Sequence, residues 1–174
     1  MKIFLIRHGE TDFDINESLV LTEKGLDQAK KLAKRLLGLE INILYHSDLK
    51  RAIQTTEEIK KIRPSLKTVE TKDLQEIYRK IIGGPSKENS GPNRFNEDSQ
   101  RAEKAWKKLI EIEHKNIAVV CHGNLIRFFI AKALNADPRN FYNLEISHTS
   151  ISALFLDKDS NLKILNVNDT SHLS

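Results

Sequence analysis

The sequence contains a single cysteine, Cys121, among its 174 residues. One thiol cannot build an internal disulfide framework, and this usage fits a reducing compartment. No stretch approaches the roughly 18 uncharged apolar residues of a membrane-spanning helix. Met1 and Lys2 lead straight into the short apolar run Ile3–Ile6 with charge behind it, which is not the pattern of a signal peptide. We therefore expect a cytoplasmic protein with no membrane partner.

The sequence also lacks a continuous basic stripe. The net charge of +4 and the pI of about 9.1 make nucleic acid a partner to consider. The lysines, however, occur as doublets on the polar sides of predicted helices, without interleaved aromatic residues: Lys30-Lys31, Lys60-Lys61 and Lys107-Lys108. We interpret them as solvated helix faces and expect no nucleic-acid partner.

Strand-like and helix-like patterns alternate along the chain. Its length and its 39% hydrophobic content predict a single domain over residues 1–174. Buried strands are expected at 3–6, 41–45, 66–69 and 117–121, helices at 22–37, 48–63, 99–113 and 125–134, and a hairpin at 151–156 and 162–167. Strands separated by helices imply right-handed crossovers. The predicted fold is a three-layer α/β/α sandwich with a mostly parallel central sheet.

Several local features of these elements can be predicted. The first helix should begin at Thr22, bury Leu26, Ala29, Ala33, Leu36 and Leu37, and end with Gly38 as its C-cap. Ser47 or Asp48 should cap the second helix. The segment "GGPSKENSGPNRFNED" predicts a loop, part of a short insertion around 77–98. Trp106 and Cys121 are expected in the core.

Chemically versatile residues follow four of the predicted strands. Arg7-His8-Gly9 ends the first strand, and "HSDLKRA" places Arg51 just after the second. Glu76 lies in "TKDLQEIYRK" after the third, and His122-Gly123-Asn124 follows the 117–121 strand. In α/β sheets, ligands bind beyond the carboxyl ends of the strands, so these groups should converge there.

Such a cluster suits phosphoryl transfer. Arginine guanidiniums and a second imidazole can hold a phosphate dianion through charge-assisted hydrogen bonds, and helix N-termini add backbone donors. A neutral histidine can attack phosphorus. A carboxyl group can protonate the leaving oxygen and then activate water.

The motifs "LIRHGET", "LTEKG", "HSDLKRA" and "VCHGN" together resemble the histidine phosphatase, or phosphoglycerate mutase-like, superfamily over nearly the whole chain. The resemblance implies a phosphoglycerate mutase-like fold, no metal and no other cofactor. It makes His8 the nucleophile and Glu76 the proton donor. It implies that Arg7, Arg51 and His122 bind the phosphoryl group, with backbone help from Gly123 and Asn124.

The branch of the superfamily is indicated less directly. The cofactor-dependent mutases carry a large insertion over the pocket, and the segment up to Asp98 is too short for it, which favours hydrolysis. "VCHGNLIRFFIAKAL", the later "TSIS" and Asp14 are similar to the mitochondrial Ser/Thr protein phosphatase branch. That branch normally carries an N-terminal membrane segment, which we do not expect here. Asp14 departs from the asparagine of many members, and its role is open.

Alternatives remain at both the residue and the function level. Glu70, Asp73 and Glu88 are nearby carboxylates that compete with Glu76, and His148, just before a strand, could line the pocket. We expect a metal-independent phosphomonoester hydrolase acting on a phosphorylated metabolite or phosphoprotein. The alternatives are a phosphoglycerate mutase and a non-catalytic phosphate-binding module. The sequence does not indicate an oligomeric state.

Overall fold

A computed structural model of the chain describes residues 1–12, 19–77, 92–112, 116–141 and 143–174. The elements follow in this order: β1 (Lys2–Arg7), α1 (Glu23–Leu36), β2 (Ile43–Ser47), α2 (Lys50–Ile62), β3 (Lys67–Thr71), η1 (Lys72–Leu74), α3 (Pro92–Ile110), β4 (Asn116–Cys121), α4 (Gly123–Ala133), η2 (Pro138–Phe141), β5 (Ile151–Leu156), β6 (Leu162–Asp169) and η3 (Ser171–Leu173).

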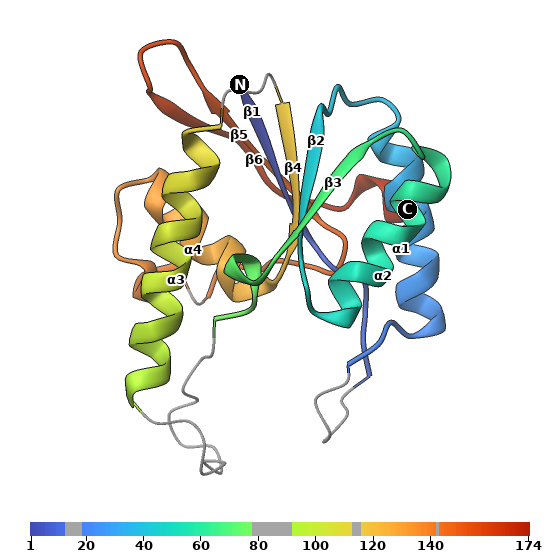
Figure 1. The fold of residues 1–174 in the computed structure, drawn as a ribbon, viewed down its shortest axis with the longest axis horizontal. Coiled ribbons are helices and arrows are strands. Elements are labelled where there is room, and N and C mark those ends of the chain that lie inside the picture. Colours follow the sequence, from blue (N-terminus) through green and yellow to red (C-terminus); the bar gives the residue numbers. More distant parts are fainter. Residues whose placement is uncertain (13–18, 78–91, 113–115, 142) are drawn as a thin grey trace.

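The strands form one six-stranded sheet in the order β3-β2-β4-β1-β5-β6. β1 pairs with β4, β4 with β2 and β2 with β3, all in parallel, whereas β5 is antiparallel to both β1 and β6. Among the described strands, β5 alone therefore runs against the others, and the predicted mostly parallel sheet is confirmed. The carboxyl ends of β1, β2, β3 and β4 meet at one edge, the lower edge in Figure 1.

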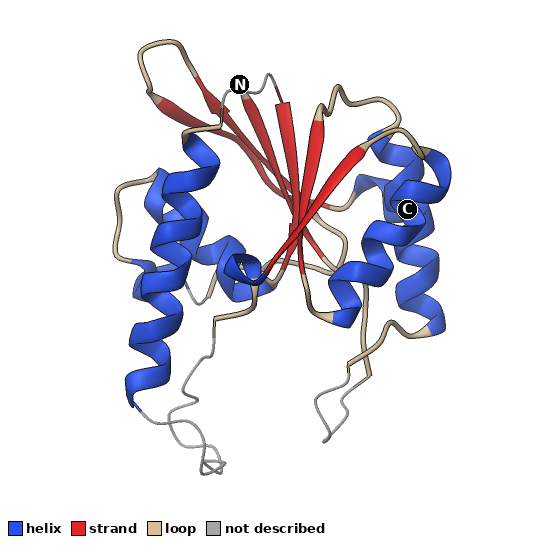
Figure 2. Ribbon diagram, viewed as in Figure 1, coloured by secondary structure: helices blue, strands red, loops and turns tan. Residues whose placement is uncertain are grey.

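Helices cover both faces of the sheet (Figures 1 and 2). Alternate residues of a strand point to opposite faces, so β1 contributes to two cores. Ile3 and Leu5 belong to the core beneath α3 and α4, and Phe4 and Ile6 to the core beneath α1 and α2. This arrangement confirms the predicted three-layer sandwich.

The first helix begins as predicted but ends differently. The Thr22 side chain accepts a hydrogen bond from the Gly25 N–H at 2.9 Å and so caps α1. Leu37 is 57% exposed rather than buried, Leu26 is only partly buried, and Leu32 lies in the core. The C-cap is Leu37 in a right-handed conformation rather than Gly38, because the helix already ends at Leu36.

The caps and starts of two other helices also differ from prediction. The N-cap of α2 is Leu49, because the Ser47 hydroxyl accepts from the Leu49 N–H and Asp48 binds Gln75. α3 begins at Pro92 rather than near residue 99, so the end of the predicted 77–98 insertion is helical. Residues 78–91 of that insertion lie outside the described chain. Trp106 and Cys121 are buried, as predicted.

Candidate active site

His8 follows β1 directly, and its backbone is held on two sides. Its N–H donates to the Cys121 carbonyl at the end of β4 (3.1 Å), and its carbonyl accepts from the Thr149 N–H (3.2 Å). The residue is 5% exposed, and ring atom Nδ1 lies 2.7 Å from the Gly9 carbonyl oxygen. Because a carbonyl can only accept, the network assigns the proton to Nδ1 and the lone pair to Nε2.

Arg51 connects His8 with His122. It lies in the first turn of α2, and its Nε is 3.2 Å from His8 Nε2 and 3.2 Å from His122 Nδ1. The centroids of the His8 and His122 rings are 5.1 Å apart. His122 is fully buried at the N-terminus of α4. Groups supplied after β1, β2 and β4 thus meet at the sheet edge, as the sequence predicts.

Two buried donors of this cluster have no hydrogen-bond partner within the described part of the chain. They are Arg7 Nε and His122 Nε2, the latter protonated because Nδ1 accepts from Arg51. Arg7 is anchored through Nη1, which donates to the Ile146 carbonyl at 2.6 Å. Buried donors without acceptors are costly, so a ligand rich in oxygen acceptors would be stabilised here.

Glycines allow the close packing around these side chains. A β-carbon at Gly123 would lie 3.6 Å from Arg7 Nε and 3.2 Å from Arg127 Nη1, so this glycine leaves room beside the arginines. A β-carbon at Gly25 would lie only 2.1 Å from the Glu10 carbonyl oxygen. The glycine of "LTEKG" therefore lets α1 pack directly on the segment that follows His8.

A threonine ties that segment to α2. The Gly9 N–H donates to Thr55 Oγ1 (3.1 Å), and the Thr55 hydroxyl donates to the Arg51 carbonyl (2.7 Å). The residue after His8 and the residue that contacts the His8 ring are therefore linked through one side chain. This link fixes the distance between the strand end and the helix start.

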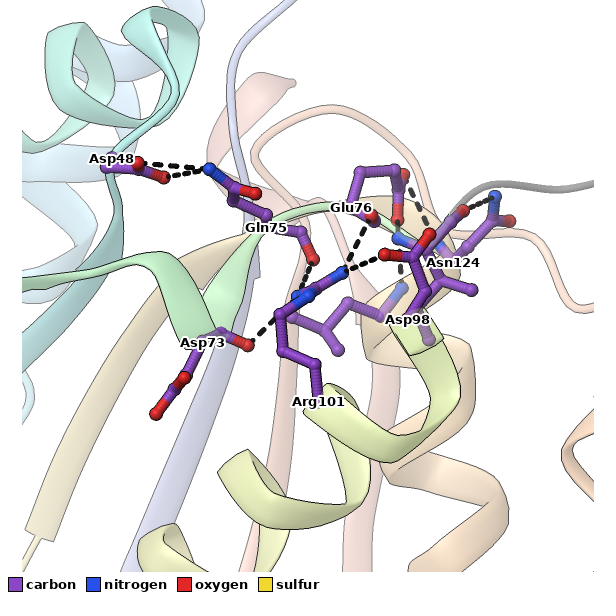
Figure 3. A network of polar contacts seen from close by, with 9 residues as sticks. Asp48, Asp73, Gln75, Glu76, Asp98, Arg101 and Asn124 are labelled. Atoms are coloured by element: carbon purple, nitrogen blue, oxygen red, sulfur yellow. Dashed lines mark hydrogen bonds and ion pairs between the residues drawn. The ribbon is translucent and has the colours of Figure 1, made fainter. Parts of the chain in front are cut away.

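The Glu76 carboxylate caps helix α4 from a distant loop (Figure 3). Oε1 accepts from the N–H groups of Ile77 (3.0 Å) and Leu125 (3.1 Å), and Oε2 accepts from the Asn124 N–H (3.3 Å). The helix N-cap residue, His122, makes no side-chain capping bond, so Glu76 satisfies these helical donors instead. The Asn124 side-chain amide donates to the Ile77 carbonyl (3.1 Å), so both donor groups of Asn124 contact the Glu76 segment.

The environment shifts the pKa values of the site in opposite directions. Burial lowers the pKa of His8 well below its usual value, and the Arg51 charge lowers it further. Burial likewise lowers the pKa of His122, and the electrostatic interaction with neighbouring His8, followed by the Arg51 charge, disfavours a positive charge there further. Desolvation raises the pKa of Glu76, although its three backbone hydrogen bonds oppose the shift. The two histidines are thus kept neutral, and the carboxyl group is driven toward its protonated form.

A third imidazole, that of His148, lies beside His8. The ring centroids are 5.6 Å apart, and burial, followed by the charge of Arg7, lowers the pKa of His148 to about 4. The sequence left this position open. The strand order identifies His148 as a residue of the site, because β5 runs antiparallel to β1 and begins at the edge where β1 ends. Asp14, and Glu88 among the carboxylates that compete with Glu76, lie outside the described residues.

No cluster of three or more His, Cys, Asp or Glu side chains suited to a metal ion occurs in the described parts of the chain. Over those same residues, no helix has the length and apolar character needed to cross a membrane. Arg7 and Arg51 bring positive charge next to His8.

A family model described as "Histidine phosphatase superfamily (branch 1)" matches residues 3–89 and 82–170. The chain belongs to the histidine phosphatase superfamily. Relatives in this superfamily include the mitochondrial serine/threonine-protein phosphatase PGAM5 of Homo sapiens, 30% identical over 183 residues, and Pgam5 of Caenorhabditis briggsae, 32% identical over 182 residues. The matches cover 98% and 99% of this chain but 63% and 64% of those relatives, so the chain spans less than two thirds of their length.

Solved structures of the superfamily share the fold. The alpha-ribazole phosphatase from Shigella flexneri superposes with a TM-score of 0.82 at 21% identity, covering 97% of this chain and 96% of that chain. The phosphoserine phosphatase from Entamoeba histolytica, in complex with 3-phosphoglyceric acid, gives a TM-score of 0.75 at 24% identity, covering 99% of each chain. The predicted phosphoglycerate mutase-like fold is therefore confirmed.

Proposed function

We propose that this histidine phosphatase superfamily member is a metal-independent phosphomonoester hydrolase that works through a phosphohistidine at His8. The observation that carries the proposal is the His8 imidazole, buried and neutral, with its Nε2 lone pair directed at Arg51. The unpartnered donors of Arg7 and His122 support it, because a phosphoryl group supplies the acceptors that they lack. The family and its relatives named as phosphatases are consistent with a hydrolase.

In the first step, His8 Nε2 attacks phosphorus, and an N–P bond forms while the P–O bond to the leaving group breaks. Arg7, Arg51 and the His122 Nε2–H hold the non-bridging oxygens, where the transition-state charge is distributed. The Nδ1–H bond to the Gly9 carbonyl stabilises the positive charge that develops on the ring. Glu76 gives its carboxyl proton to the leaving oxygen. We assign that proton to Oε2, which accepts only the longest of the three backbone bonds.

In the second step, the Glu76 carboxylate takes a proton from water, and the resulting hydroxide attacks phosphorus. The N–P bond breaks, orthophosphate leaves, and neutral His8 is restored. Glu76 is protonated again, so the cycle balances. The raised pKa of Glu76 supports both roles, because the carboxyl group can hold a proton at a pH where a free glutamate is ionised.

The substrate is proposed to be a phosphoprotein or a phosphorylated metabolite. The relatives named serine/threonine-protein phosphatases support the first class. A screen of phosphopeptides and phosphorylated metabolites with the wild type and His8→Ala would separate the two classes.

The central test uses p-nitrophenyl phosphate in the presence of EDTA. The wild type should release phosphate, the His8→Ala variant should be inactive, and rapid quenching should trap a phosphoryl group on His8. A requirement for a divalent ion would contradict the proposal. Binding of phosphate or vanadate without turnover would instead indicate a binding module, and interconversion of 2- and 3-phosphoglycerate without phosphate release a mutase.

A further inference from the structure

Arg101, on α3, holds the backbone of the loop that carries Glu76 (Figure 3). Its Nη1 donates to the carbonyls of Asp73 (3.1 Å) and Gln75 (2.7 Å), and its Nη2 donates to the carbonyl of Glu76 (3.0 Å). Nη2 also contacts Asp98 Oδ1, one helical turn earlier, at 2.9 Å. One guanidinium therefore binds three carbonyls of a four-residue stretch and a carboxylate on its own helix.

The environment of this contact favours a fixed geometry. The side chains of Arg101 and Asp98 are only 19% and 16% exposed, so water competes weakly for these hydrogen bonds. The planar guanidinium donates in fixed directions, which a flexible lysine ammonium cannot reproduce. Such an arrangement determines where the loop backbone lies relative to α3.

Two other contacts fix the same loop against the rest of the site. The Gln75 amide donates to both carboxylate oxygens of Asp48 (2.9 and 3.0 Å), close to the start of the helix that carries Arg51. The Glu76 carboxylate binds the N-terminus of α4, next to His122. Arg101 is the contact that binds the main chain of Glu76 itself, and so it sets the point from which the carboxylate extends.

We propose that Arg101 is a positioning residue that orients Glu76 for proton transfer to the leaving group. This role rests on the hydrolase function proposed above. Arg101 touches no reacting atom, and it acts through the Glu76 backbone. Proton transfer requires hydrogen-bond reach, and small displacements of a catalytic group are costly, so loss of the clamp should impair protonation more than phosphate binding.

The leaving group provides a readout that a structural role would not change. A p-nitrophenolate leaves as a stable anion and needs little protonation, whereas an unsubstituted phenolate needs more. kcat/KM for a series of ring-substituted phenyl phosphates therefore measures how well the acid is placed. For Arg101→Met, kcat/KM should fall about 10- to 100-fold with phenyl phosphate but less than about 3-fold with p-nitrophenyl phosphate.

Arg101→Lys and Glu76→Gln separate the possible causes. The charge of Arg101 also acts on His122, and lysine keeps that charge while losing the planar fork. In Arg101→Lys, kcat/KM should therefore depend more steeply on leaving-group pKa than in the wild type, but less steeply than in Arg101→Met. In a Glu76→Gln background, Arg101→Met should add no further steepening, because the acid that it positions is already absent.

Arg63 offers a matched control. Its guanidinium also binds three backbone carbonyls, those of Leu36 (3.1 Å), Leu39 (3.3 Å) and Ile41 (3.2 Å), at the far end of α2 from Arg51. Arg63→Met should lower the melting temperature without changing the leaving-group dependence. Circular dichroism would show that each variant is folded at the assay temperature.

The outcomes distinguish this role from the function on which it rests. Suppose that the wild type forms phospho-His8 and hydrolyses the series. If Arg101→Met then shows the same dependence of kcat/KM on leaving-group pKa as the wild type, the positioning role alone is overturned. Equal steepening in Arg63→Met would overturn it as well, by showing a general effect of instability. A wild type that neither hydrolyses the series nor forms phospho-His8 would overturn the proposed function, and the positioning role with it.

Discussion

Arg51 imposes opposite tautomers on the two histidines that it contacts. Its single Nε–H faces Nε2 of His8 and Nδ1 of His122. His8 consequently carries its proton on Nδ1, toward the Gly9 carbonyl, and His122 carries its proton on Nε2. One ring is left with a lone pair for attack and the other with a proton for binding an oxygen, although the residues are chemically identical.

The opposite pKa shifts of His8 and Glu76 predict a specific pH dependence. His8 must be neutral and Glu76 protonated for the first step. Because the pKa of His8 is lowered, the nucleophile persists into acidic pH, and because the pKa of Glu76 is raised, the acid is lost only as pH rises through its shifted value. kcat/KM for phenyl phosphate should therefore be highest on the acidic side and decline toward alkaline pH.

The profiles of the wild type and Glu76→Gln provide the measurement. The variant should be slower and should lack the alkaline decline. Ionisation of the substrate phosphate, near pH ~6, appears in both profiles and cancels in their ratio. An alkaline decline of equal size in both enzymes would show that Glu76 is not the acid.

At the scale of secondary structure, the contact between α1 and the β1–α1 segment depends on Gly25. The Gly25 position lies against the Glu10 backbone, and Thr22 both caps α1 and donates its N–H to the Glu10 carbonyl (3.0 Å). Gln28, one turn into the helix, accepts from the Glu10 N–H (2.9 Å). The helix N-terminus is thus fastened to the segment that begins with His8.

Gly25→Ala should separate these elements. The added methyl group would lie 2.1 Å from the Glu10 carbonyl oxygen, and overpacking of this kind costs about 1–3 kcal/mol of unfolding free energy. Activity should fall as well, because the displaced segment holds His8. Urea unfolding and p-nitrophenyl phosphate turnover measure the two effects.

Gly38→Ala is the control for the helix substitution. A β-carbon at Gly38 has its nearest neighbours at 3.8 and 3.9 Å, so the methyl group fits. Stability should change by no more than about 0.5 kcal/mol, with full activity. Equal losses in Gly25→Ala and Gly38→Ala would rule out the steric explanation.

The strands were predictable from sequence to within about two residues, because hydrophobic runs determine them, but the start of α3 was not. The strand at 117–121 was predicted within one residue of β4, and the edge where it ends correctly located His122. Pro92, in a segment rich in turn residues, instead opens α3, consistent with the preference of proline for the first helical turn. Asp48 was one of two residues predicted to cap α2, but it binds Gln75, a partner that is distant in the sequence.

Residues that act by binding backbone groups also could not be identified from the sequence. Arg7, His8, Arg51 and His122 were predicted to converge because each follows a strand. Arg101 resembles any arginine on a helix, and its carbonyl partners become apparent only in three dimensions. The capping role of Glu76 was missed for the same reason, since the N–H groups that it binds lie on a helix 48 and 49 residues away.

At the scale of the whole molecule, burial of neutral histidines should make stability depend on pH. The pKa values of His8 and His122 are lowered in the folded state, so the unfolded chain binds more protons as pH falls below the ordinary histidine pKa of about 6.5. The stabilisation is complete above that pH and is lost progressively below it. At about pH 5.5, each buried neutral histidine should cost about 1 kcal/mol of unfolding free energy.

Urea unfolding at about pH 7.5 and about pH 5.5 tests this dependence. The His8→Asn variant should lose part of the pH-dependent difference, because one of the histidines with a lowered pKa is gone, while His122 and His148 remain. An unchanged difference in this variant would show that other groups cause the acid sensitivity.

The pairing of β1 with β4 gives the site a further property. Arg7 pairs with Cys121, so His8 and His122 are the next residues of two neighbouring strands. A slip of one residue would shift β4 by about 3.3 Å and turn its side chains to the opposite face. Such a chain could keep its helices and strands while placing Cys121, or a backbone group, where His122 belongs. Turnover would then serve as a sensitive reporter of strand alignment during refolding, detecting misaligned molecules that circular dichroism counts as native.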